Sequence, residues 1–151
     1  MASYTLDSTQ ETWEKYWPGD EYVDWVGYSY WANGTYNGDV LTFARKKNLP
    51  VFVAEITPRG FNFAAKGSEH IWYDWFEHFF KHIEQNKDVI KAISYINADW
   101  DSQTMWENSN WGNTKIQANS KIRAKWRQKM SEKTYVHTTK GTYKLIDFEA
   151  K

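Results

Sequence analysis

The order of apolar and polar positions along the chain predicts strands that alternate with helices. A β-rich run at 22–31 follows a Pro-Gly-Asp turn at 18–20, and a short apolar run occupies 50–54. Another apolar run at 88–97 predicts a further strand, and the segment SYTL at 3–6 is a candidate for a fourth.

Helical segments are expected between and after these strands. Residues 39–48 combine an aspartate at the start with two lysines at the end, where the helix dipole favours cations. A second helix is expected over 68–86, with Ser68 as its N-cap, because large apolar residues recur there at helical spacing. A third is expected from Ser120 to about Glu132, where apolar residues are four apart.

This alternation favours parallel βαβ units, in which functional residues lie on loops after the carboxyl ends of the strands. Tyr30, Trp31, Glu55, Asp99 and Trp100 stand at those ends. A complete (β/α)8 barrel needs about 250 residues. With 151 residues and three or four strands, the chain predicts an α/β fold that is about half of a (β/α)8 TIM barrel.

The chain is long enough for one domain with a sizeable core. We expect 1–151 to form a single half-barrel domain, with 1–10 as the remnant of a preceding unit. Residues 134–151 are expected to be a C-terminal extension, either a short hairpin or an irregular segment.

Aromatic residues make up 19% of the chain, with 10 Trp, 10 Tyr and 8 Phe. Such side chains usually fill cores. Several tryptophans nevertheless stand among polar residues, as in NADWDSQTMWENSNWGN at 97–113, and the mean hydropathy is −0.80. Exposed aromatic clusters mark interaction sites, so this loop favours a surface that grips flat sugar rings over a purely structural one.

Charge and residue content narrow the classes of partner. Lys and Arg number 19 and Asp and Glu number 19, so no net field favours nucleic acid or an acidic membrane. Basic residues of the third helix are spread around it, which also argues against nucleic acid. No apolar run approaches the roughly 18 residues of a membrane span.

Metal and cofactor chemistry is not expected. The chain has no cysteine. His78 and His82 are four apart and would share a helix face, but without a third ligand a solvated face is favoured over a metal site. The N-terminus shows no signal-peptide pattern, so the sequence as written indicates the cytoplasm and leaves localisation undetermined.

Several segments resemble the C-terminal half of glycoside hydrolases similar to family 26. These are YWPGDEYVDWVGYSYW (16–31), LPVFVAEITPRG (49–60) and ISYINADWDSQTMW (93–106), within a resemblance that covers about residues 11–135. Family 26 enzymes are β-mannanase-like retaining glycosidases of clan A, usually secreted. The resemblance implies that the strands at 22–31, 50–55 and 89–97 match the sixth, seventh and eighth strands of a barrel.

The resemblance also implies roles for individual residues. Glu55 would be the catalytic nucleophile, and Tyr30 would place its hydroxyl against it, with Tyr28 as the second choice. Trp100 would stack on the sugar, and Trp106 or Trp111 would extend that platform. The further substrate contacts are Trp31, Tyr28, Asp99 and Arg59. From the residues alone, Glu55 is equally read as a strand-terminal acid paired with Arg59, and Asp99 and Asp101 as loop residues that bond local backbone.

One expected residue has no counterpart in this chain. Enzymes of clan A carry an acid/base glutamate after the fourth strand, whereas the resemblance begins beyond that point. Retaining hydrolysis uses two carboxyl groups about 5–5.5 Å apart. We therefore expect the chain alone to be a weak or inactive endo-β-glycanase-like glycosidase.

Four hypotheses follow for the function. The chain is the C-terminal half of a retaining glycanase acting on a β-linked polysaccharide or oligosaccharide. Alternatively, two copies pair as a homodimer to complete a barrel. A third hypothesis is a non-catalytic carbohydrate-binding or interaction module. A fourth is a stable remnant with no present sugar function.

Overall fold

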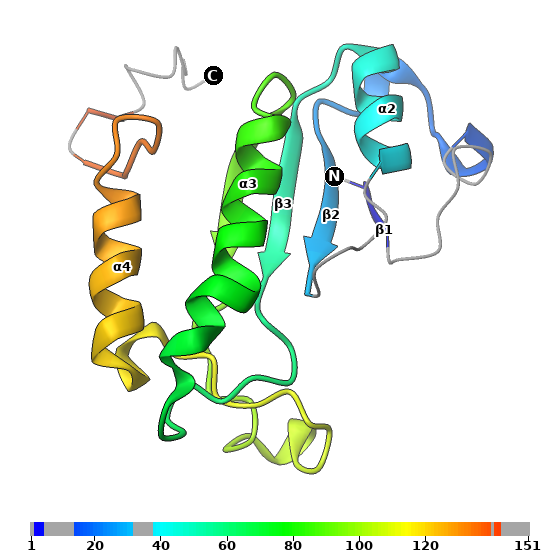
Figure 1. Ribbon diagram of the computed structural model, residues 1–151. Helices are drawn as coiled ribbons and strands as arrows, with labels where there is room; N and C mark the ends of the chain where they lie inside the picture. Colours follow the sequence, from blue (N-terminus) through cyan, green and yellow to red (C-terminus); the bar gives the residue numbers. More distant parts are fainter. Residues whose placement is uncertain (1, 5–13, 32–37, 140, 143–151) are drawn as a thin grey trace.

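A computed structural model describes residues 2–4, 14–31, 38–139 and 141–142 of the chain. Its centre is one sheet of four parallel strands in the order β1-β2-β3-β4 (Figure 1). The strands are β1 (Ala2–Tyr4), β2 (Val26–Tyr30), β3 (Val51–Ile56) and β4 (Ile90–Tyr95). The predicted strands are therefore confirmed, including the short one near the N-terminus.

The helices are α2 (Gly38–Lys47), α3 (Glu77–Gln85) and α4 (Ser120–Met130). The segment expected as one helix over 68–86 is divided into a 3₁₀ turn at Ser68–His70, a π-helical turn at Trp72–Phe76 and then α3. Ser68 is not the expected N-cap, because its hydroxyl donates to the carbonyl of Phe63 at 2.7 Å.

The cap of α4 is Asn119 rather than a serine. Its side-chain oxygen accepts from the backbone amides of Lys121 at 2.9 Å and Ile122 at 3.0 Å, which satisfies two donors that the first helical turn leaves free. The Asn119 amide also donates to the buried Ser68 hydroxyl at 2.9 Å, so the cap ties the start of α4 to the start of the preceding helical segment.

The expectation of a half (β/α)8 barrel is wrong. The described strands form an open sheet with β1 and β4 at its two edges, and the described helices pack on one side of it (Figure 1). Alternating strands and helices dictate parallel pairing, but closure depends on strand tilt and stagger, which the hydrophobic pattern does not encode. Most of the predicted remnant at 1–10, and residues 143–151 of the predicted extension, lie outside the described residues.

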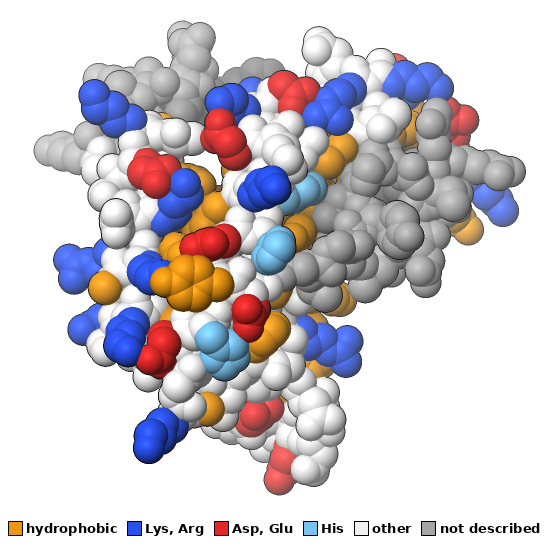
Figure 2. Space-filling view, viewed as in Figure 1, with side chains coloured by type: hydrophobic (Ala, Val, Ile, Leu, Met, Phe, Trp, Pro, Cys, Tyr) orange, Lys and Arg blue, Asp and Glu red, His pale blue; other side chains and the backbone are white. Residues whose placement is uncertain are grey.

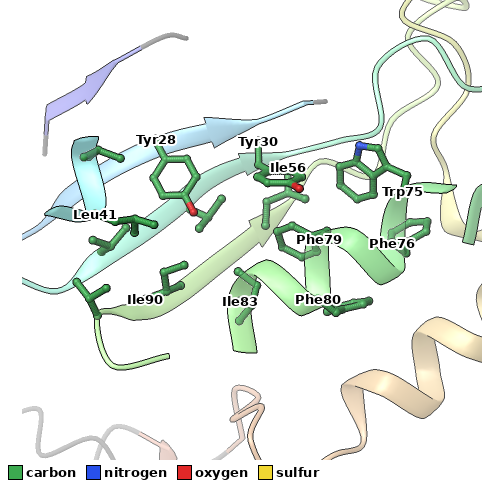
Figure 3. Packing of buried hydrophobic residues seen from close by; sticks show 14 of the residues in the cluster. Tyr28, Tyr30, Leu41, Ile56, Trp75, Phe76, Phe79, Phe80, Ile83 and Ile90 are labelled. Carbon is green, nitrogen blue, oxygen red and sulfur yellow. The ribbon is translucent and has the colours of Figure 1, made fainter. Parts of the chain in front are cut away.

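The core lies between the sheet and α3 and consists largely of aromatic rings (Figure 3). The Tyr30 ring packs edge-on against Trp75 and Phe79, with centroids 5.6 and 5.1 Å apart. From α4, Trp126 contacts Phe76 at 5.8 Å between centroids. Burying a Phe-sized side chain contributes about 1.5–3 kcal/mol, so these rings hold helices to sheet.

The outer side of the helices is charged. Figure 2 shows Lys, Arg, Asp, Glu and His side chains interspersed over this face, as expected for a surface in contact with water. Within the described residues, no helix is long and apolar enough to cross a membrane.

A buried tyrosine–histidine pair joins β2 to α3. The Tyr28 hydroxyl and the His82 Nε2 atom are 2.5 Å apart, and Tyr28 is 2% exposed. Burial lowers the pKa of His82 because the charged imidazolium is poorly solvated there. The same burial raises the pKa of Tyr28, so the neutral pair is the stable form.

This pair makes stability depend on pH. Because the pKa of His82 is lower in the folded chain than in the unfolded chain, its contribution to stability is complete above about pH 6.5 and is lost as the pH falls through the folded pKa. We expect His82→Gln, which keeps an acceptor for Tyr28 but does not titrate, to lose less unfolding free energy than the wild type between about pH 8 and pH 5. Urea unfolding at the two pH values measures this.

The matched control is His78→Gln, which removes an exposed histidine of the same helix. Its pH dependence should follow the wild type. Equal pH dependence for the wild type and His82→Gln would contradict the assignment of the neutral imidazole to His82.

Candidate functional site

Residues that follow β2, β3 and β4 meet at one edge of the sheet. The backbone amide of Thr57 donates to the Tyr30 carbonyl at 3.3 Å, and that of Arg59 donates to the Trp31 carbonyl at 3.2 Å. Parallel strands bring their carboxyl ends to the same edge, so the loop after each strand has its neighbours within hydrogen-bond reach.

Two loops at this edge are bonded to each other through their backbones. The 57–67 loop follows β3, and the 98–116 loop follows β4. The Gly60 amide donates to the Trp111 carbonyl at 3.1 Å, and the Phe63 amide donates to the Asn113 carbonyl at 2.8 Å. These bonds fix the tryptophan-rich loop against the end of β3.

Two buried threonines support the same junction. The hydroxyls of Thr57 and Thr114 are 2.8 Å apart, and both residues are fully buried. The Trp100 indole N–H donates to the Thr114 hydroxyl at 3.1 Å, and the Tyr95 hydroxyl donates to the Thr114 carbonyl at 2.7 Å. Satisfied polar networks of this kind make a loop adopt one conformation.

An extra residue in β3 determines where Glu55 points. Tyr28 of β2 is paired with Val53, whereas the next residue, Ser29, is paired with Glu55, so Ala54 has no opposite residue. This is a β-bulge, and a bulge changes the direction of the side chains that follow it. Val51, Val53 and Ile56 all lie in the core, which is inconsistent with strict alternation and confirms that the alternation shifts before Ile56.

Glu55 consequently lies on the sheet face opposite the helices, and its side chain is exposed. The Ser29 hydroxyl donates to its Oε2 atom at 2.7 Å. Tyr28 and Tyr30 flank Ser29 in sequence and point to the helical face, where both are buried (Figure 3). The hydroxyl that the structure brings to Glu55 is thus that of Ser29, on the face opposite to both predicted tyrosines.

Four tryptophans form a cluster beside this edge: Trp31, Trp100, Trp106 and Trp111. Trp111 is at its centre, with centroid distances of 5.3 Å to Trp31, 5.0 Å to Trp100 and 5.2 Å to Trp106. The Arg59 guanidinium lies over the Trp111 ring at 4.8 Å, which is a cation–π contact. The predicted site residues Trp31, Trp100, Trp106 and Arg59 are therefore brought together.

The members of this tryptophan cluster differ in exposure. Trp100 is 9% exposed and Trp111 is 8% exposed, so both serve largely as packing for the loop. Trp31 and Trp106 are only half-buried. The rings with accessible surface are therefore those two, rather than the Trp100 ring favoured from the sequence.

The two aspartates of the loop have local partners. The Asp101 carboxylate accepts from the Gly112 amide at 3.0 Å, which is the loop-bonding role considered for it. Asp99 uses its backbone carbonyl to accept from Ser102 and Gln103, and its carboxylate has no described hydrogen bond or ion pair. Asp99 thus remains the loop carboxylate with capacity for a further contact.

The site offers an exposed carboxylate, a hydroxyl bonded to it and partly exposed aromatic rings on bonded loops. Three supporting residues were missed from the sequence, namely Ser29, Thr57 and Thr114, because short hydroxyl side chains in and beside strands carry no distinctive pattern. Among the described residues no group of three or more metal-ligating side chains gathers, and His82 faces Tyr28.

Comparison with known proteins gives relatives of one kind. No protein-family model matches the chain. The β-1,3-xylanase TXYA from a Vibrio species is 36% identical over 161 residues, which cover 90% of this chain and 34% of the relative. A β-1,3-xylanase from an Alcaligenes species is 32% identical over 175 residues, which cover 99% of this chain and 37% of the relative.

The chain thus spans about a third of the length of the curated relatives it matches. β-1,3-Xylanases are glycoside hydrolases, so the predicted relationship to glycoside hydrolases is confirmed. The finer resemblance to β-mannanase-like enzymes of family 26 is not reproduced by these relatives.

A glycine holds the two loops at contact distance, which gives a test of the site's architecture. Gly112 has a φ of +82°, and a Cβ there would lie 2.0 Å from the Phe61 carbonyl oxygen. We expect Gly112→Ala to lower the free energy of unfolding by about 3 kcal/mol or more, because backbone strain and a steric clash add. Urea unfolding measures this, and near-ultraviolet circular dichroism should show altered tryptophan packing.

Gly67→Ala is the matched control. Gly67 has a similar φ of +78°, but a Cβ there meets nothing within 4 Å. This variant should lose only about 1 kcal/mol and keep the tryptophan signal. Equal losses in the two variants would contradict the close loop contact.

Proposed function

We propose that this chain carries the nucleophile carboxylate, Glu55, of a retaining glycoside hydrolase site for a β-linked polysaccharide. The observation that supports it most is the placement of Glu55, an exposed carboxylate that the β3 bulge directs away from the core, at the edge where the tryptophan cluster lies. The β-1,3-xylanase relatives favour β-1,3-linked xylan as the substrate.

The chemistry would proceed by displacement at the anomeric carbon. In retaining hydrolysis one carboxylate attacks that carbon while a second carboxyl group, about 5–5.5 Å away, protonates the departing oxygen. The described residues offer Asp99 and Asp101 on the neighbouring loop, but Asp101 already accepts from the Gly112 amide. We therefore assign no general acid, and propose that the chain alone hydrolyses natural polysaccharide weakly or not at all.

Sugar binding is assigned to the half-buried rings of the cluster. Trp106 and Trp31 would stack on sugar rings, with Trp100 behind them as support. Arg59 and Asp99 are exposed or half-buried at the same edge and would contact sugar hydroxyls. A family 26-like origin of the site agrees with this set of roles and is part of the proposal.

A substrate that needs no acid tests the nucleophile directly. The 2,4-dinitrophenyl β-glycoside of β-1,3-xylobiose has a leaving group that departs without a proton. We expect release of dinitrophenolate by the full chain to fall at least about 100-fold in Glu55→Gln, because the amide cannot attack. Glu77→Gln, an exposed glutamate of α3, is the control and should match the wild type.

The same experiment separates the main alternative. Xylooligosaccharide binding that survives Glu55→Gln and is lost in Trp106→Ala, with no dinitrophenolate released by the wild type, identifies a non-catalytic carbohydrate-binding module. Absence of both turnover and binding contradicts a carbohydrate function for this edge.

Self-association is a second proposal, supported by the face opposite the helices. Tyr22, Trp25 and Phe52 line a hollow of about 290 Å³ on this side, and Tyr22 and Trp25 are 72% and 37% exposed. Exposed aromatic patches of this kind favour contact with another protein surface. We propose that a second copy of the chain packs against it.

Analytical ultracentrifugation at micromolar concentration tests this proposal. We expect a dimer whose dissociation constant rises at least about tenfold in Trp25→Ser, because removal of the exposed indole reduces the apolar area that association buries. Tyr73→Ser, which removes an aromatic ring that is 55% exposed on the helical face, should leave it unchanged. A monomeric wild type contradicts the proposal.

A further inference from the structure

We propose that Ser29 is a positioning residue for Glu55. Its hydroxyl lies 2.7 Å from Oε2 and holds one carboxylate oxygen, which leaves the other for bond formation with a sugar. This inference rests on the proposed nucleophile role of Glu55, and it adds a residue that acts only through Glu55.

The sheet register supports this role independently of the hydrogen bond. Ser29 is the first residue of β2 after the register shift, and the shift is what places it directly opposite Glu55. Opposed residues in neighbouring strands project from the same face with their Cβ atoms close together. The bulge therefore directs Glu55 outward and aligns a donor with it at the same time.

The backbone on both sides of Ser29 is held in place. Tyr28 is anchored by its contact with His82, and Tyr30 packs against Trp75 and Phe79. A donor on a strand anchored in this way has little freedom to move away from its acceptor. A bond between a hydroxyl and a carboxylate is charge-assisted, so it restricts the rotamers of an otherwise exposed glutamate.

The step that Ser29 would assist leaves the serine proton in place. A Glu55 oxygen forms a bond to the anomeric carbon as the bond from that carbon to the leaving oxygen breaks. The electron pair departs with the leaving group, and an activated phenolate needs no proton. Ser29 keeps its hydroxyl proton throughout and limits the orientations from which the carboxylate attacks.

Covalent labelling of Glu55 tests the inference. The probe is 2,4-dinitrophenyl 2-deoxy-2-fluoro-β-1,3-xylobioside, and the rate of mass increase of the full chain is followed, with the label located by peptide mapping. We expect Ser29→Ala to be labelled about 10-fold more slowly than the wild type, and Ser29→Thr, which keeps the hydroxyl, to stay within about threefold. Ser131→Ala, at the far end of α4, is the control and should not differ.

Side-chain order at Glu55 is measured in parallel, because it does not depend on turnover. Carbon-13 relaxation of the Glu55 Cγ methylene should show an ordered side chain in the wild type and Ser29→Thr and a more mobile one in Ser29→Ala. Unchanged order in Ser29→Ala overturns the positioning role, and so does a labelling rate equal to that of Ser131→Ala. An unlabelled wild type overturns the nucleophile proposal instead, and the relaxation result then decides the role of Ser29 alone.

Discussion

The extra residue in β3 is the constraint on which the rest of the site depends. Without it, alternation would place residue 55 on the same side as Val51 and Val53, in the core against the helices. A carboxylate there would lose its hydration without a partner, at a cost of several kcal/mol. The bulge resolves this conflict, because it returns Ile56 to the core and leaves Glu55 in contact with water and Ser29.

The loops beside Glu55 owe their shape to polar contacts more than to aromatic packing. Backbone bonds join the loops that follow β3 and β4, and the Thr57–Thr114 contact lies beneath them, where no water satisfies the hydroxyls. Gly112 lets the chain pass the Phe61 carbonyl at a distance that any side chain would prevent. The tryptophans pack onto this frame, so two of them serve as structure and two retain exposed surface.

The sequence predicted the strands, the helices and the position of Glu55 at the end of a strand, because these depend on local periodicity. It did not predict which face each side chain occupies after the bulge, since one unpaired residue reverses the alternation and Ala54 has no distinguishing feature. The choice of Tyr30 as the contact of Glu55, made from the resemblance, placed that ring on the wrong face for the same reason. The open sheet also lay beyond the pattern, because open and closed parallel sheets share the same order of strands and helices.

The distribution of tryptophans shows how composition alone misleads about a sugar site. Trp100 stands between two aspartates in sequence and resembles an exposed platform, yet its indole N–H is bonded to Thr114 and its ring is enclosed by Trp106 and Trp111. An indole whose polar atom is satisfied inside the fold gains little from a ligand, whereas a half-buried ring still has apolar surface to cover. Recognition of a polysaccharide at this edge therefore depends more on Trp31 and Trp106, and Trp100 contributes by keeping the loop in place.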